Sequence, residues 1–228
     1  MTERQDLGEH SQEKNPLEKP HNEFSSANYW EQRYKRGGNS GAGSHTHLME
    51  FKSSVLNEFI ENAKIGSVVD FGVGDGSQLV GLRVKQYIGF DVSQTILLYL
   101  KETFSSDPSK HFFHVSEYTQ QRAELAMSLD VIFHLIEDSV FHEYMSRLFD
   151  SATKYVIIYS SNRENYYREA PHVKHRKFSR WVRQYRKEWK CVQFIKNKYP
   201  MRDQHDDQIS RTFSNFYVFE RITLQYDL

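Results

Sequence analysis

Cysteine is almost absent from this sequence, which has one, Cys191, among its 228 residues. A single thiol excludes an internal disulfide framework and a zinc site built from several cysteines, and it fits a reducing compartment. Net charge is absent too, because 30 basic side chains balance 30 acidic ones. No field of one sign therefore draws the whole molecule to nucleic acid or an anionic membrane, so electrostatic recognition must come from local patches.

Long apolar runs are also missing. No stretch approaches the roughly 20 residues that a membrane-spanning helix needs, and the amino terminus lacks the basic-then-apolar layout of a signal peptide. We therefore expect no membrane span and a cytoplasmic location. Residues 1–24 are polar, contain Pro16 and Pro20, and give a core little to bury. We predict a disordered tail there and a single domain over residues 25–228.

Short apolar segments alternate with amphipathic ones along the rest of the chain. The predicted strands span residues 67–71, 86–92, 111–115, 123–128, 155–159, 191–195 and 216–222. The predicted helices span residues 51–60, 139–149 and 178–189, with another from residue 78 onward. A further helix, with Ser93 as its N-cap, carries the apolar residues 96, 97, 98 and 100. Strands separated by helices imply right-handed crossovers and a mostly parallel sheet. No helix-length segment separates the last two strands, so we expect them to form an antiparallel hairpin at the sheet edge.

A glycine-rich turn, DFGVGDG over residues 70–76, follows the first predicted strand. Glycines let a backbone turn sharply and approach a ligand closely. A dinucleotide-binding loop would have glycine where this chain has Ser77, and Asp75 would repel a pyrophosphate but tolerate a cationic ligand. About twenty residues past Asp70, Asp91 ends the second predicted strand, where an acid accepts hydrogen bonds from both hydroxyls of a ribose. The pattern favours S-adenosylmethionine, which carries a sulfonium and an ammonium and no phosphate.

With these features, the sequence resembles the class I, Rossmann-like family of S-adenosylmethionine-dependent methyltransferases from about Tyr29 to its end. The similar stretches are YWEQRY (29–34), VVDFGVGDG (68–76), YIGFDVS (87–93) and SLDVIFHLIED (128–138). The resemblance implies an α/β fold with a doubly wound, mostly parallel seven-stranded sheet and a C-terminal antiparallel hairpin. It also implies an enzyme that uses S-adenosylmethionine, with the glycine turn under the methionine moiety and the acid of the second strand on the ribose. By position, the adenine neighbours would be Ser116, Glu117 and Tyr118.

Residues 29–48 look like the family's cofactor cover. Trp30 and Tyr34 would pack over the ligand, while Arg33 would pair with the methionine carboxylate through a bidentate contact. The alternative is that the aromatic residues only anchor the tail to the core. The expected cofactor-binding residues are Trp30, Arg33, Tyr34, Asp70, Phe71, Gly72, Gly74, Asp75, Gly76, Asp91, Val92, Glu117, Tyr118, Ser128, Leu129 and Asp130.

Three histidines are the candidate catalytic residues. Methyl transfer from a sulfonium is an in-line displacement, so the protein mainly has to align the acceptor and exclude water. A hydroxyl acceptor must also lose its proton, which suits His134, His172 or His175 as a general base. Alternatively, His134 closes the start of a helix beneath the adenosine. The spacing of His172 and His175 is compatible with a metal, but we expect none, because no cysteine lies nearby and the Asp-Asn pair of metal-dependent catechol-type relatives is absent.

A basic insertion, residues 162–190, follows the fifth predicted strand, and the cationic excess extends over residues 163–202. Interleaved aromatics supply stacking surfaces, so the segment is either a lid for a negatively charged acceptor or a solvated basic face of an amphipathic helix. We expect a small-molecule or glycan-type acceptor, methylated at oxygen. An RNA or protein methyltransferase docking through this segment is the alternative, although no appended RNA-binding motif is present. A non-catalytic cofactor-binding subunit is the third hypothesis.

Overall fold

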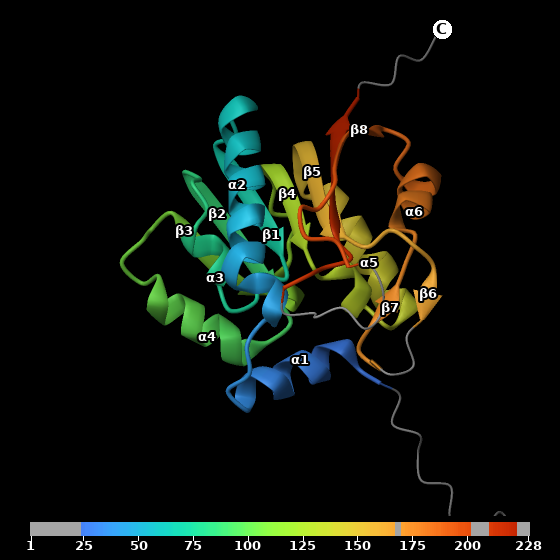
Figure 1. The fold of residues 1–228 in the computed structure, drawn as a ribbon. Coiled ribbons are helices and arrows are strands. Elements are labelled where there is room, and N and C mark those ends of the chain that lie inside the picture. The colour runs from blue at the N-terminus through green and yellow to red at the C-terminus, as the bar shows by residue number, and fades with distance from the viewer. Residues whose placement is uncertain (1–23, 167–169, 202–209, 223–228) are drawn as a thin grey trace, which may run out of the picture.

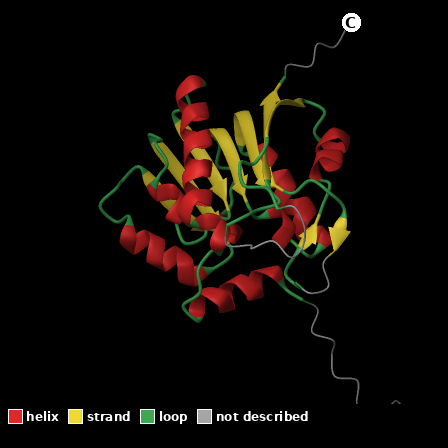
Figure 2. Ribbon diagram, viewed as in Figure 1, coloured by secondary structure: helices red, strands yellow, loops and turns green. Residues whose placement is uncertain are grey.

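The structure is a computed structural model, and it describes residues 24–166, 170–201 and 210–222. Figure 2 shows a central sheet with helices on both of its faces. The helices are α1 (Ser26–Lys35), α2 (Thr46–Asn62), α3 (Ser77–Val80), α4 (Gln94–Thr103), α5 (Asp138–Asp150) and α6 (Phe178–Tyr185). Short 3₁₀ turns are η1 (Ala42–Ser44), η2 (Val115–Glu117) and η3 (Ile132–His134).

The main sheet has seven strands in the order β3-β2-β1-β4-β5-β9-β8. They are β1 (Ser67–Phe71), β2 (Gln86–Asp91), β3 (Lys110–His114), β4 (Ala123–Leu129), β5 (Ala152–Ser160), β8 (Trp189–Ile195) and β9 (Asn215–Arg221). The first five run parallel, and β9 is antiparallel to both β5 and β8. The predicted seven-stranded, mostly parallel sheet with a C-terminal antiparallel pair is confirmed. The chain's last strand lies between β5 and β8, so it is β8 that forms the sheet edge.

Alternate side chains of the central strands enter two separate cores. Val68 and Ile157 pack with the apolar residues of α2 and α4 on one face. Val69 and Ile158 pack with those of α5 and α6 on the other face. Burial on both faces explains why these strands are almost continuously apolar, and each fully buried aliphatic side chain contributes about 1.5–3 kcal/mol.

One helix, α6, is shorter than predicted. Helix α3, predicted only to begin near residue 78, is a single turn capped by Gly81, where a Cβ atom would lie 2.6 Å from Ser53 Oγ of α2. Helix α6 ends at Tyr185, because Trp189 is already paired with Arg221 in the β8–β9 ladder. The insertion also contains a two-stranded sheet, β6 (Asn165–Tyr166) and β7 (Lys174–His175). Strands of two residues are too short for an alternating pattern to predict.

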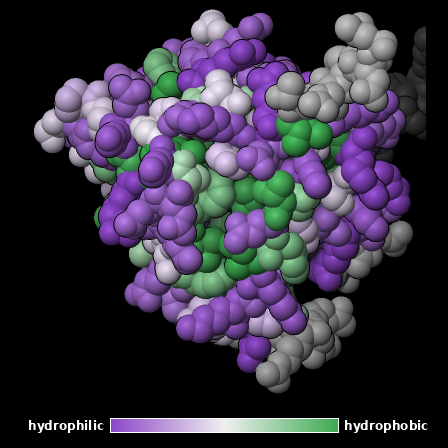
Figure 3. Space-filling model, turned by 90° about the horizontal axis from the view of Figure 1, so that it is seen from above, coloured by the Kyte–Doolittle hydropathy of each residue, from purple (hydrophilic) through white to green (hydrophobic). Residues whose placement is uncertain are grey.

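Helix α1 begins at the end of the predicted tail. Residues 1–23 lie outside the described residues, and the ring of Phe24 lies 5.8 Å from that of Tyr29. Figure 1 shows α1 crossing below the sheet, at the carboxyl ends of the parallel strands, and Figure 3 views the protein from the opposite end, where an apolar area is bordered by hydrophilic side chains. Within the described ranges, no helix has the length and apolarity needed to cross a bilayer.

Candidate functional site

A cavity of about 330 Å³ lies beneath α1, where strands β1, β2 and β4 end. The predicted cofactor residues that line it are Trp30, Tyr34, Asp70, Phe71, Gly72, Gly74, Asp91, Val92, Leu129 and Asp130. His134 lines it as well. These residues come from four separate parts of the chain, and three of these parts are brought together because the carboxyl ends of parallel strands share one edge of the sheet.

The glycine turn shapes one wall of the cavity. Gly72 and Gly74 have φ angles of 85° and 59°, a region that favours glycine. A Cβ atom at Gly72 would lie 2.4 Å from Val131 Cγ2, and one at Gly74 would lie 2.3 Å from Ser40 Oγ. The turn thus needs glycine for its conformation and for its close contact with the neighbouring segments.

Asp91 is buried at the end of β2 and is held by the turn. Its Oδ2 accepts the Gly74 backbone N–H at 2.9 Å, and its Oδ1 accepts that of Ser93 at 3.0 Å. Burial raises the pKa of this carboxyl despite the two hydrogen bonds. Each carboxylate oxygen can accept a second hydrogen bond, so the side chain is oriented and can still receive two hydroxyl groups.

Two buried oxygen atoms at the cavity have no hydrogen-bond partner among the described residues. Asp70 Oδ2 accepts the Tyr87 hydroxyl at 2.7 Å, but its Oδ1 is unpartnered, as is Gln78 Oε1. Both side chains line the cavity. Burial raises the pKa of Asp70 to about 7, against the opposing effects of Tyr87 and the Lys52 ammonium. Unpartnered buried acceptors are costly, and a ligand with N–H donors and positive charge would satisfy them.

Lys52 is a cavity residue that the sequence analysis missed. Its side chain is 1% exposed, and its Nζ donates to Asp130 Oδ2 at 3.0 Å. Asp130 in turn accepts the Ser214 hydroxyl at 2.7 Å. The four-residue spacing in the sequence could have predicted the burial of this lysine, because the buried face of α2 consists of Leu48, Lys52, Leu56 and Ile60. A lysine in a buried stripe of four-residue spacing requires a partner.

Helix α1 is fastened over the cavity at two points. Near its start, the backbone N–H of Ser26 donates to Glu137 at 2.9 Å. Further along, Glu31 accepts the Ser93 hydroxyl at 2.6 Å and the Thr95 hydroxyl at 2.8 Å. The bond from Ser93 is the main reason that the pKa of Glu31 falls to about 2. These contacts hold Trp30 and Tyr34 over the cavity.

Six predicted cofactor residues are not among those that line the cavity: Arg33, Asp75, Gly76, Glu117, Tyr118 and Ser128. Arg33 Nε donates to the Asn39 carbonyl at 2.6 Å. Asp75 accepts the Ser40 backbone N–H at 2.8 Å, which ties the glycine-serine stretch to the glycine turn. Lys52, in contrast to Arg33, lines the cavity, and its ammonium acts electrostatically on Asp70.

His134 is the one candidate base that lines the cavity. Its Nδ1 lies 2.8 Å from the backbone oxygen of His172. A carbonyl can only accept, so Nδ1 carries the hydrogen and Nε2 keeps the lone pair. Burial lowers the pKa of His134 to about 4, so the ring is neutral at physiological pH. The rings of Tyr29, His172 and His134 stack in that order, with centroids 4.7 and 5.5 Å apart.

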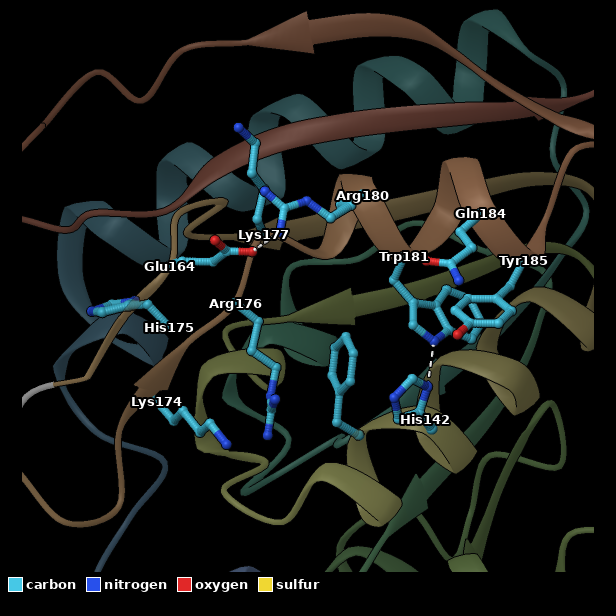
Figure 4. Close-up of a pocket in the computed structure, with 11 residues that line it drawn as sticks. His142, Glu164, Lys174, His175, Arg176, Lys177, Arg180, Trp181, Gln184 and Tyr185 are labelled. Carbon is cyan, nitrogen blue, oxygen red and sulfur yellow. Dashed lines mark hydrogen bonds and ion pairs between the residues drawn. The ribbon is translucent and has the colours of Figure 1, made fainter.

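The other two histidines lie apart from this cavity. His172 is the middle ring of the stack, and burial lowers its pKa. His175 is buried with its Nδ1 2.5 Å from the Ser161 hydroxyl, and burial together with Arg163 lowers its pKa to about 4. It borders a second cavity, of about 520 Å³, between α5 and α6 (Figure 4). In the described parts of the chain, no three His, Cys, Asp or Glu side chains are grouped to hold a metal ion.

The basic insertion is partly neutralised by internal ion pairs. Lys174 and Arg176 both contact Asp138, at 2.8 and 2.5 Å. Arg186 contacts Asp150 at 3.1 Å. These three cations fasten the insertion to α5 and so serve the fold.

Neither the protein-family models nor the curated protein sequences contain a match to this chain. Solved structures do match. Magnesium protoporphyrin IX methyltransferase (ChlM) from Synechocystis PCC 6803 with bound SAH is 13% identical, with 86% of this chain and 97% of that chain covered and a TM-score of 0.60. N-methyltransferase NodS from Bradyrhizobium japonicum WM9 in complex with S-adenosyl-L-homocysteine is 10% identical, with coverages of 84% and 98% and a TM-score of 0.61.

An O-methyltransferase family protein from Burkholderia thailandensis is also similar, at 10% identity and a TM-score of 0.55, with 78% of this chain and 57% of that chain covered. At such identities the likeness concerns the fold. This chain has the class I methyltransferase fold, as its sheet order also indicates.

Proposed function

We propose that this chain is an S-adenosylmethionine-dependent methyltransferase whose cofactor binds in the cavity beneath α1. The observation that carries the proposal is the pair of unpartnered buried acceptors, Asp70 Oδ1 and Gln78 Oε1, beside the glycine turn and Asp91. Two buried carboxylates favour a cationic ligand and oppose a pyrophosphate. Solved structures of the same fold with S-adenosylhomocysteine bound support the choice of cofactor.

The lining residues match the cofactor group by group. Asp91 would accept the two ribose hydroxyls, and Asp70 and Gln78 would accept the N–H donors of the ammonium. Lys52, instead of Arg33, would face the carboxylate, because it is the cation that lines this end of the cavity. When bound, S-adenosylmethionine supplies an electrophilic methyl group on a sulfonium. The roles of Trp30 and Tyr34 are to cover the ligand and exclude water.

His134 supports an oxygen acceptor. Its Nε2 keeps a lone pair because Nδ1 is committed to the His172 carbonyl. As the acceptor oxygen forms its bond to the methyl carbon and the sulfur–carbon bond breaks, the hydroxyl proton passes to Nε2. We therefore propose a hydroxyl of a small or glycan-type acceptor as the substrate class. Within this fold, N-methyltransferases and O-methyltransferases both occur, so the acceptor has to be argued from the site.

Docking of RNA or protein through residues 163–202 is the less favoured alternative. Lys174, Arg176 and Arg186 are each paired with an acid of α5. Cations with internal partners release fewer counterions on binding a phosphate backbone. Only a measurement of turnover distinguishes an enzyme from a non-catalytic subunit. A screen of nucleotide sugars and glycans with labelled cofactor would measure it.

Calorimetry tests the cofactor assignment directly. We expect S-adenosylmethionine and S-adenosylhomocysteine to bind and NAD not to bind. Asp91→Ala should weaken binding by on the order of 1 to 3 kcal/mol, because the ribose hydroxyls lose their acceptor. Glu58→Ala, which removes an exposed acid of α2 outside the cavity, is the matched control. Binding of NAD in place of the sulfonium ligand, or an unchanged affinity in Asp91→Ala, would contradict the assignment.

A further inference from the structure

The second cavity, between α5 and α6, has two chemically different halves. Figure 4 shows the cations Lys177, Arg180 and Arg176 on one side and the rings of Trp181, Tyr185 and His142 on the other. We propose that this cavity is a binding site for a nucleoside diphosphate, with the phosphates on the cations and the base on the rings. The site is separate from the cofactor cavity, and its occupancy does not depend on methyl transfer.

Two of the cations are available to an anion. Arg176 already donates four hydrogen bonds, to Asp138 and to the backbone oxygens of Leu135 and Ile136, so most of its donors are in use. Lys177 is exposed, and its side chain makes no ion pair or hydrogen bond within the described ranges. Among the described residues, the Arg180 side chain pairs with Glu164, at 2.6 Å, and both of these side chains are more than half exposed. An ion pair of this kind is weak, and a phosphate can replace the carboxylate.

The ring half offers a fixed stacking surface. Trp181 is 7% exposed, and its Nε1 donates to His142 Nδ1 at 2.7 Å, which fixes both rings. The centroid of the Tyr185 ring lies 5.2 Å from that of Trp181 and 5.8 Å from that of His142. The Tyr185 side chain is 51% exposed. An exposed ring held by two others gives a flat base a partner at small entropic cost. Phosphate and ring recognition within one cavity together point to a nucleotide.

Helix α5 separates this cavity from the other one. Val140 and Glu143 face the cofactor cavity, whereas Phe141 and His142 face the second cavity. The two sites also differ in charge: buried carboxylates line the first, and the second has four cations against Glu164. S-adenosylmethionine has no phosphate, so it does not meet the requirements of the second cavity. Lys174, Arg176 and Arg186 are already paired with acids of α5, so few cations around the cavity remain for a long polyanion, and a short anion fits better.

The test is calorimetric titration of the full chain with UDP, ADP and inorganic pyrophosphate at low salt. We expect both nucleotides to bind, and pyrophosphate to bind more weakly. Lys177→Glu should weaken all three by at least about tenfold, and Tyr185→Ala should weaken the nucleotides without changing pyrophosphate. Glu164→Gln should strengthen binding, because it frees Arg180.

Matched controls remove an exposed side chain of the same type elsewhere. Lys187→Glu and Tyr99→Ala should leave nucleotide affinity within about twofold of the wild type, and saturation with S-adenosylhomocysteine should not displace the nucleotide. The proposal is overturned by absence of nucleotide binding or by equal losses in Lys177→Glu and Lys187→Glu. Displacement by S-adenosylhomocysteine would overturn it as well, as would binding confined to RNA.

Discussion

Replacing Asp70 with asparagine should stabilise the ligand-free protein above neutral pH and weaken cofactor binding. The pKa of the buried carboxyl is about 7, against an ordinary value of 3.8. Between these two values the folded protein holds a proton that the unfolded chain has lost. Its stability therefore falls as the pH rises from about 4 to 7, and above about 7 the full penalty of burying the charge is present. Asparagine carries no charge at any pH, so it avoids this penalty.

The size of this penalty follows from the difference between the two pKa values, 3.8 and about 7. At about 1.4 kcal/mol for each pH unit, the penalty for burying the charged carboxylate is about 4 kcal/mol. Asparagine still accepts the Tyr87 hydroxyl through its carbonyl, but an uncharged acceptor makes a weaker bond by about 1 kcal/mol. The net gain at pH 8.5 is about 3 kcal/mol, or roughly 6 to 12 °C in melting temperature for a chain of this size. At pH 5 Asp70 is neutral in the folded protein but ionised in the unfolded chain, so only about 1.2 pH units of the penalty have built up, and the gain should fall to about 1.6 kcal/mol.

Thermal unfolding of both proteins at pH 5 and pH 8.5, without ligand, measures this difference. Asp138→Asn is a control of opposite sign, because Lys174 and Arg176 lower the pKa of Asp138 to about 2. That variant should lose stability at pH 8.5. Calorimetry with S-adenosylhomocysteine completes the test, since Asp70→Asn presents an N–H donor to the ligand's ammonium and should bind it more weakly. A loss of stability in Asp70→Asn that is equal at both pH values would refute the reasoning.

The remaining predictions concern Lys52 and His134. Lys52→Met should lower the melting temperature, because it strands Asp130, and should weaken S-adenosylmethionine binding about tenfold. In the double variant Lys52→Met/Asp130→Asn, the stability should recover and the affinity should not, and recovery of both would exclude the carboxylate role. His134→Gln should reduce turnover by about a hundredfold with S-adenosylhomocysteine affinity unchanged. Because the pKa of His134 is about 4, its neutral form persists at higher pH, and the wild-type rate should decline only towards acid; an inflection near pH 6.5 that vanishes in the variant would contradict this.

The sequence by itself determined the sheet and the core of the candidate cofactor site. Apolar strands alternating with amphipathic helices specify a parallel sheet, because period and burial are local properties of the chain. The positions of the glycine turn and of Asp91 could also be predicted from the local pattern. Each lies directly after a strand, and the carboxyl ends of parallel strands converge on one edge whatever the details of packing. Lining residues such as Gly72, Gly74 and Asp91 could therefore be named from the pattern alone.

Tertiary structure alone decided which charged groups face the cavity. Arg33 lies in the predicted cover but does not line the cavity, and its Nε donates to the backbone of the following loop, whereas Lys52 meets Asp130 across 78 residues of sequence. It also placed β9 between β5 and β8 and put His175 beside the second cavity. A local pattern reports the neighbours of a residue along the chain. The direction of a long side chain depends instead on which distant element packs against it, and that becomes determined only when the helices settle on the sheet.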